Sequence, residues 1–443
     1  MDRTRGKRKF TIESLEKRCM LDGNVTTSFA NGILTITGDS TSNAIAITTP
    51  SDGVLKITGL MQGGEPTLIN GESVKQGLGV TSIVINFNDG DTGVNVGNDV
   101  VVITNLSITG SISITTGDGD DFIGIGNFDN SSGEVDSAVN SLQGAVDVGK
   151  GFTINMQGGE NTLSAQDVSS QTSGANMTIT GGDGDDTVTL KNTAIIHGVG
   201  FSDIGDSSLN FNNLTTKNLA LTLGIGNDSV TLQNSTVSVS ANINTGYGND
   251  TVNLQQDVLG SLTSSLGPGD DQFTGDNVTI NGPTTIDAGK GNDTVTLNTV
   301  QARDLTVLMN IGDDQMSLTD VTAKNALLNG GDGADTLTVS GLTATTLTMN
   351  GGNGNDQMNL SGMTVANGAN LNAGAGSDTM SLDGLSASKL SVTLGVGADS
   401  VSVEDVSVTG KAAFFGGDGT DTYNNLGGDT FGTLSQKLFE NIT

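Results

Sequence analysis

The chain of 443 residues contains few of the residues that build compact globular cores. Tryptophan is absent, aromatic residues make up 3% of the chain, there are 4 prolines, and Cys19 is the single cysteine. One cysteine excludes an intramolecular disulfide framework. No stretch approaches 18 consecutive apolar residues, so the sequence predicts no transmembrane helix.

Basic residues are also scarce. The chain has 18 Lys and Arg against 49 Asp and Glu, which gives a formal net charge of -31, and Arg303 is the only arginine after residue 18. Nucleic acids and anionic membrane surfaces need a basic face, because their phosphate charges must be neutralised. The sequence therefore predicts neither of them as a partner.

Glycine is abundant, with 65 residues, and much of it belongs to a Gly-x-Gly-x-Asp motif that returns every 21 or 22 residues. We call the Asp of each copy a marker aspartate. A short fixed period predicts a solenoid, in which each unit buries its apolar face against its neighbours. The marker aspartates are Asp121, Asp186, Asp228, Asp250, Asp271, Asp293, Asp314, Asp335, Asp356, Asp378, Asp399 and Asp421, with a worn copy at Asn161 and a blurred one near Asp206.

The residues after each marker alternate between polar and apolar types, as in Thr187-Val188-Thr189-Leu190. This two-residue period indicates β-strands with one buried face. Stacking of the coils then predicts an inward ladder of Val295, Met316, Leu337, Met358, Met380 and Val401. A second alternating run precedes the glycines of the next copy, and a shorter third run lies between these two runs. We therefore predict an all-β fold, a parallel β-helix with 21–22 residues and about three short strands per coil, right-handed as strand crossovers usually are. The alternative for an acidic, Gly-rich chain is disorder. A disordered chain does not need Val, Leu and Met at fixed distances from the glycines, as they are here.

The composition divides the chain into four parts. Residues 1–22 are expected to be a basic export-type tail, 23–110 N-terminal β coils or a cap, 111–425 the parallel β-helix, and 426–443 a C-terminal cap. The stretch LEKRCML at 15–21 resembles the LEPR-XLL tag at the start of many large bacterial secreted or surface proteins, although Lys17 and Met20 depart from it. The alternative is a disordered basic tail.

Stacked markers bring carboxylates together. At about 5 Å, two bare carboxylates repel by about 0.8 kcal/mol even in bulk water, and a divalent cation would reverse this. The stretch GGDGADTLT at 330–338 resembles the calcium-binding nonapeptide GGxGxDxUx of the repeats-in-toxin family, as do GGDGDDTVT from Gly181 and GGNGNDQMN from Gly351. The resemblance implies Ca²⁺ as a partner and the twelve marker aspartates as its ligands, at one corner per coil. The alternative is that each Asp forms the turn by bonding to its own backbone.

These observations favour a secreted or cell-surface bacterial β-solenoid with a structural or adhesive role, stabilised by calcium and meeting carbohydrate or protein at the surface. The alternatives are a polysaccharide-acting β-helix enzyme, either lyase or hydrolase, and a passive fragment of a larger surface architecture. Catalysis is disfavoured because the motif repeats uniformly, whereas an active site departs locally from a repeat. His197 is such a departure, but no nucleophile or basic residue lies near it in the sequence.

Overall fold

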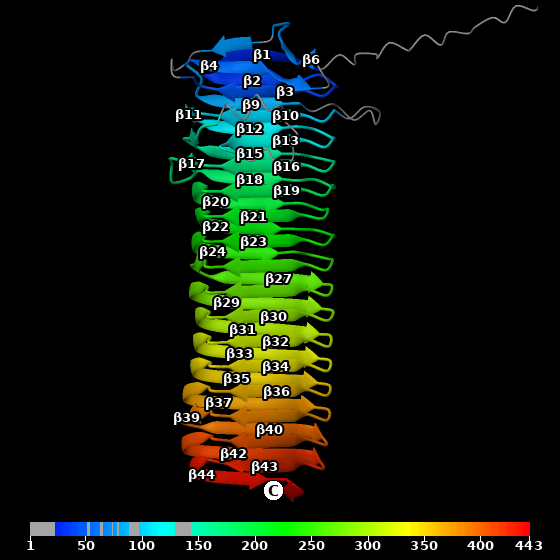
Figure 1. Cartoon of the computed structure of the whole chain (residues 1–443), viewed down its shortest axis with the longest axis vertical. Helices are drawn as coiled ribbons and strands as arrows, with labels where there is room; N and C mark the ends of the chain where they lie inside the picture. The colour runs from blue at the N-terminus through cyan, green and yellow to red at the C-terminus, as the bar shows by residue number, and fades with distance from the viewer. Residues whose placement is uncertain are drawn as a thin grey trace, which may run out of the picture.

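The chain stacks into a straight rod of β-strand coils in a computed structural model (Figure 1). The structure describes residues 23–50, 54–62, 65–72, 74–77, 79–87, 97–128 and 143–443. The basic tail at 1–22 and its tag-like stretch lie outside these ranges. No helix long and apolar enough to cross a membrane occurs among the described residues.

One sheet of 19 strands, counted over the described residues, runs along one side of the rod. Most of its members are five-residue strands that follow the marker position. In chain order they are β3 (Ala44–Thr48), β4 (Leu55–Gly59), β8 (Val74–Gly77), β10 (Val100–Thr104), β13 (Phe122–Gly126), β16 (Thr162–Gln166), β19 (Thr187–Lys191), β21 (Ser208–Asn212), β23 (Ser229–Gln233), β25 (Thr251–Gln255), β28 (Gln272–Asp276), β30 (Thr294–Asn298), β32 (Gln315–Thr319), β34 (Thr336–Ser340), β36 (Gln357–Ser361), β38 (Thr379–Asp383), β41 (Ser400–Glu404), β43 (Thr422–Gly427) and β45 (Asn441–Ile442).

A second sheet, of 24 strands within the described ranges, forms the rest of each coil. In many coils the two remaining predicted strands run on as one long bent strand. The members are β1 (Asn24–Ala30), β2 (Ile33–Thr37), β7 (Leu68–Ile69), β9 (Ser82–Asn86), β11 (Leu106–Ile108), β12 (Ser111–Thr115), β14 (Val146–Val148), β15 (Gly151–Asn155), β17 (Val168–Ser170), β18 (Asn176–Thr180), β20 (Ala194–Ser202), β22 (Thr215–Thr222), β24 (Thr236–Asn244), β26 (Val258–Leu259), β27 (Leu262–Pro268), β29 (Thr279–Lys290), β31 (Gln301–Ile311), β33 (Thr322–Asp332), β35 (Thr343–Asn353), β37 (Thr364–Ala375), β39 (Ser386–Ala387), β40 (Leu390–Gly397), β42 (Ser407–Gly419) and β44 (Thr430–Lys437).

The predicted parallel β-helix is confirmed. Strands one coil apart pair in parallel and in register, as where Met316 of β32 lies beside Leu337 of β34 and Leu337 beside Met358 of β36. The predicted inward ladder of Val295, Met316, Leu337, Met358, Met380 and Val401 is buried throughout. Each coil therefore buries its apolar side chains against the coils above and below, as the repeat required.

The two ends differ from the middle. At the N-terminal end the pairing becomes antiparallel between β1 and β2, between β3 and β4 and between β4 and β8, while β5 (Met61–Gln62) and β6 (Glu65–Pro66) form a separate hairpin. At the other end, β44 pairs in parallel with β42 and β45 with β43. Residues 426–443, expected to form a cap, thus add strands in the same direction as the coils.

Candidate functional site

The Gly-x-Gly-x-Asp loop connects the end of a long strand to the next five-residue strand. In the coil of Asp356, the backbone φ angles are +128° at Gly352 and +130° at Gly354. A Cβ placed on Gly354 would lie 1.9 Å from the carbonyl oxygen of Gly333 in the preceding coil. Both the left-handed backbone and the close approach of neighbouring loops therefore require glycine.

The structure brings all twelve predicted marker aspartates into one column along the rod, which we call the marker column. Their side chains point inward and are between 0% and 2% exposed. One carboxylate oxygen, Oδ1, accepts a hydrogen bond from the backbone N–H at the same position one coil earlier. The distances include 2.9 Å from Asp335 N to Asp356 Oδ1 and 2.8 Å from Asp356 N to Asp378 Oδ1. The marker aspartates thus join neighbouring coils.

The same bond is made where asparagine takes the place of the marker aspartate. Asn161 accepts from the backbone N–H of Asp121 at 3.0 Å. The loop before Ser207 is shorter, and there the N–H of Asp186 instead donates to the backbone carbonyl oxygen of Asp206 at 3.1 Å. An amide oxygen therefore replaces the carboxylate oxygen without loss of the inter-coil contact.

The column is longer than the sequence analysis predicted. Asp99 occupies the marker position of an earlier coil and accepts from the N–H of Asn43 at 2.6 Å, while Glu440 accepts from the N–H of Asp421 at 2.7 Å. The stretch Gly97-Asn98-Asp99 repeats the Gly-Asn-Asp of four later loops, which is a signal that the sequence offers for this position. Glu440 has no such signal, because its loop lacks the glycines.

The second carboxylate oxygen, Oδ2, is also buried, and in the coil of Asp356 it lies beside Gly351. A Cβ on Gly351 would lie 2.6 Å from Asp356 Oδ2. In the part of the chain that the structure describes, Oδ2 has no hydrogen-bond partner in Asp271, Asp293, Asp314, Asp335, Asp356, Asp378, Asp399 and Asp421. A buried polar atom without a partner is costly when it carries charge.

The pKa values of the marker carboxyls respond to this burial. Loss of solvation raises the pKa of Asp271 and Asp293 to about 7, and the hydrogen bond from the neighbouring coil opposes the shift only in part. The same cause raises the pKa to about 6 in Asp314, Asp335, Asp356, Asp378 and Asp399. Near neutral pH these carboxyls are therefore divided between the protonated and the ionised form.

A second column lies outside the first and consists of the residue directly before each marker. Its side-chain oxygens bond in the opposite direction along the rod. Asn227 Oδ1 accepts from the backbone N–H of Asn249 at 2.9 Å, and Asn249 Oδ1 accepts from the N–H of Asp270 at 2.9 Å. Where this residue is Asn or Asp, the coil is thus held to one neighbour by its marker residue and to the other by the residue before it. Ala334 and Ala398 interrupt this second column.

The marker corner fits calcium poorly as a closed protein site. Calcium takes six to eight oxygen ligands, whereas each marker carboxylate already uses Oδ1 and offers one buried oxygen per coil. Within the described ranges, no group of three or more His, Cys, Asp or Glu side chains is arranged to hold a metal ion. The predicted calcium ligands are therefore placed in one column, but the structure gives them a hydrogen-bonding role, and calcium binding stays a prediction.

One hollow with acidic lining residues lies at an early corner of the rod. Its volume is about 330 Å³, and it is lined by Asp120, Glu160 and Asp185 from consecutive coils, with Asn98 and Asn161 beside them. Asp120 Oδ1 accepts from the N–H of Glu160 at 3.0 Å, so the hollow is part of the second column.

The single histidine, His197, and the only arginine after residue 18, Arg303, lie on the surface. His197 contacts Asn176, with 3.0 Å between Nδ1 and Oδ1, and Arg303 pairs with Asp304 at 2.8 Å. Neither lines the acidic hollow or the groove described next.

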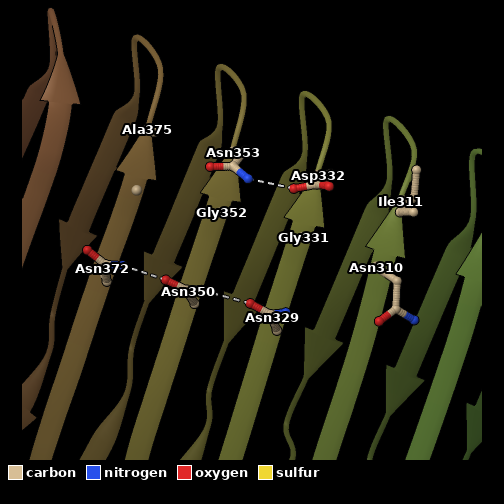
Figure 2. Close-up of a pocket in the computed structure, with 11 residues that line it drawn as sticks. Asn310, Ile311, Asn329, Gly331, Asp332, Asn350, Gly352, Asn353, Asn372 and Ala375 are labelled. Carbon is tan, nitrogen blue, oxygen red and sulfur yellow. Dashed lines mark hydrogen bonds between the residues drawn. The ribbon is translucent and has the colours of Figure 1, made fainter.

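The larger hollow is an open groove of about 670 Å³ over β31, β33, β35 and β37, which we call the amide groove (Figure 2). One wall is a row of half-buried asparagines in register. Asn350 donates to Asn329 at 2.9 Å and Asn372 donates to Asn350 at 2.6 Å. Glycines form the floor, and the other wall is the base of the loops. The lining residues are Asn310, Ile311, Asn329, Gly331, Asp332, Asn350, Gly352, Asn353, Asn372, Gly374 and Ala375.

Comparison with protein-family models, with curated proteins and with solved structures finds no match to this chain. The resemblances of its loops to the repeats-in-toxin nonapeptide and of its tail to the LEPR-XLL tag therefore remain predictions.

Proposed function

We propose that this chain is an exported structural and adhesive β-solenoid that acts as a rigid rod at or outside a bacterial cell surface. The observation that carries the proposal is the continuous parallel stacking of coils, joined by the marker column from Asp99 to Glu440. Such a stack resists bending, because every coil is bonded to both neighbours by backbone ladders and by side chains. The first sheet stacks 19 strands along the rod, and at about 4.8 Å per step these give a rod about 86 Å long.

The surface supports the same proposal. A net charge of -31 keeps the rod soluble and disfavours anionic partners. The outward positions of the five-residue strands carry Thr, Ser, Asn and Gln, as in Thr294, Thr296 and Gln315. Rows of hydroxyl and amide groups favour contact with polar, uncharged surfaces.

Calcium belongs to this proposal as the agent that offsets the stacked carboxylates. Its support is the unpartnered, buried Oδ2 of the eight marker aspartates from Asp271 to Asp421, which needs either a proton or a cation. Because the column is closed, calcium would have to be enclosed as the coils stack. Bound calcium would supply positive charge and would hold these carboxyls in the ionised form.

A polysaccharide-acting enzyme is the weaker candidate. A glycoside hydrolase of the usual kind needs two unlike carboxyl groups that flank one bond. The amide groove has a single carboxyl group, that of Asp332, among its lining residues. A groove with a single carboxyl group favours binding a ligand over cleaving it.

The proposal is tested by locating the full chain, tail included, in a bacterial host that exports it. Antibody labelling of intact cells and protease treatment from outside should detect the chain, while a cytoplasmic marker protein stays protected. Small-angle scattering of the purified chain should give a thin rod with a maximum dimension of at least about 86 Å. A chain that is found only inside cells would contradict export, and a compact globular scattering profile would contradict the rod.

A further inference from the structure

The amide groove is a local departure from the repeat. Its wall position is occupied by Asn329, Asn350 and Asn372 in three consecutive coils, whereas the preceding coil has Leu308 and the following coil has Thr393. The strands are in register across the groove, so the three amides form one straight row (Figure 2). From this row we propose that the amide groove binds a linear, neutral polysaccharide chain laid along the rod axis. This inference deepens the adhesive part of the proposed function and rests on it.

The floor of the groove is kept open by glycine. Gly331, Gly352 and Gly374 have φ angles of +120°, +128° and +122°. A Cβ at any of the three would lie within 1.9 Å of a carbonyl oxygen in the preceding coil. No side chain can therefore fill the floor, and a ligand can lie directly against the backbone.

At one end of the groove, an asparagine takes the place of the floor glycine. Asn310 occupies the floor position of the coil before Gly331 with a φ angle of +74°, and its side chain reaches back to Asp287, with 2.6 Å between Nδ2 and Oδ1. The glycine floor therefore runs from Gly331 to Gly374 within the groove.

The amide row matches the hydroxyl groups of sugars. Each carboxamide has two N–H donors and an oxygen with two lone pairs, and the ladder uses one donor of Asn350 and of Asn372. The remaining donors and lone pairs of these half-buried lining residues have no hydrogen-bond partner among the described residues. A sugar hydroxyl both donates and accepts, so successive rings of a linear glycan can meet equivalent amides in successive coils.

The charges of the lining select a neutral chain. Asp332 is the only ionisable residue among the lining residues, and its Oδ1 accepts from Asn353 Nδ2 at 2.6 Å. No lysine or arginine lines the groove, so nothing there can pair with the carboxylates or sulfates of an acidic polysaccharide. On a chain with a net charge of -31, an anionic ligand is repelled.

An extended peptide fits the row less well. Its side chains on one face repeat at about 6.6 Å, twice the rise per residue, whereas coils repeat at about 4.8 Å. The floor strands also pair on both sides with neighbouring coils, which leaves no free strand edge for a peptide to join. The geometry therefore favours a chain whose recognition groups are hydroxyls.

The test is affinity electrophoresis of the purified full chain in gels that contain hydroxyethylcellulose, mixed-linkage β-glucan or galactomannan, with polygalacturonate as the anionic comparator. We expect at least one neutral glycan, and not polygalacturonate, to retard the chain. Asn350→Leu removes the central amide at similar volume and should weaken that affinity about tenfold or more, because several hydrogen bonds are lost. The matched control is Asn359→Leu on β36, a half-buried asparagine of the same coil on the other sheet, which should leave the affinity unchanged.

Retardation by none of the three neutral glycans would overturn the inference. An Asn350→Leu variant with wild-type thermal stability and wild-type retardation would overturn it too, as would retardation by polygalacturonate alone. These failures are distinct from failure of the proposed function, since rod-shaped scattering and surface labelling do not depend on Asn350. A chain that binds a neutral glycan but stays inside cells would instead contradict export and leave the groove assignment standing.

Discussion

Raising the pH from 5 to 8 in the presence of EGTA should destabilise the rod. The pKa of the carboxyl in Asp314, Asp335, Asp356, Asp378 and Asp399 is raised by burial from an ordinary value near 4 to about 6. Between these two values the folded chain binds more protons than the unfolded chain, so stability is fully present below about pH 4 and is lost as the pH rises through 6 to 7.

The size of the effect follows from the shift. Two pKa units correspond to about 3 kcal/mol for each marker aspartate that ionises while it stays buried. Three ionised neighbours would therefore cost on the order of 10 kcal/mol, which is comparable to the whole stability of an ordinary domain. For a chain of this length we expect the melting temperature to fall by about 10–20 °C.

The assay is thermal unfolding followed by circular dichroism at pH 5, 6, 7 and 8. Repulsion between carboxylates on the surface is the competing cause of a fall in melting temperature. A repeat in 0.5 M NaCl screens the surface charges and should leave most of the fall in place. A melting temperature that is constant, or that rises from pH 5 to pH 8, would refute the reasoning.

Three further predictions address the loops, the coils and calcium. Gly354→Ala should destabilise the rod by about 2–4 kcal/mol in urea unfolding, because the added Cβ would lie 1.9 Å from a backbone carbonyl oxygen. Gly174→Ala is the control and should be near neutral, because no atom lies within 4 Å of its added Cβ. Equal effects of the two substitutions would argue against the close approach. Deletion of residues 336–356, one whole coil from marker to marker, should retain the β-sheet circular dichroism signal, while deletion of half that segment should lower it. Calcium in the millimolar range should raise the melting temperature at pH 8 more than at pH 5 if it replaces the missing protons, and no rise at either pH would remove calcium from the proposed function.

Much of the fold was predictable because its signals are local. The strand alternation and the glycine spacing repeat in every coil, so each copy reinforced the interpretation of the others. The ladder from Val295 to Val401 is buried as predicted, because side chains two residues apart in a strand share a face. The joining of two predicted strands into one bent strand was not predictable, because it depends on bulges such as the register shift between Ile280 and Pro283.

The burial of the marker aspartates was not predicted, although the sequence contains the sign of it. Asp186 lies two residues before Val188 and four before Leu190, on the same face as both, and all three are buried. Asp is rarely buried unless it is paired, and the backbone N–H that holds it inside comes from another coil, 25 residues away for Asp186 and 21 or 22 residues away in most coils. Likewise, the asparagines of the amide groove are regularly spaced in the sequence, but the depth of the groove depends on the glycine floor and the loop base.

The central claim is that the eight marker aspartates from Asp271 to Asp421 each join two coils through Oδ1 and carry a costly, unpartnered Oδ2. The most direct test compares the melting temperatures of Asp356→Asn, Asp356→Ala and the wild-type chain at pH 8 in EGTA. Asparagine keeps the acceptor for the N–H of Asp335, as Asn161 does for Asp121, and cannot ionise. Alanine leaves that buried N–H without its acceptor, at a cost of about 1–3 kcal/mol.

We predict that Asp356→Asn melts above the wild-type chain at pH 8, that this advantage shrinks or reverses at pH 5, and that Asp356→Ala melts below Asp356→Asn at both pH values. If Asp356→Asn is instead as unstable as Asp356→Ala at pH 8, the ionised carboxylate itself holds the coils together, and the claim is wrong.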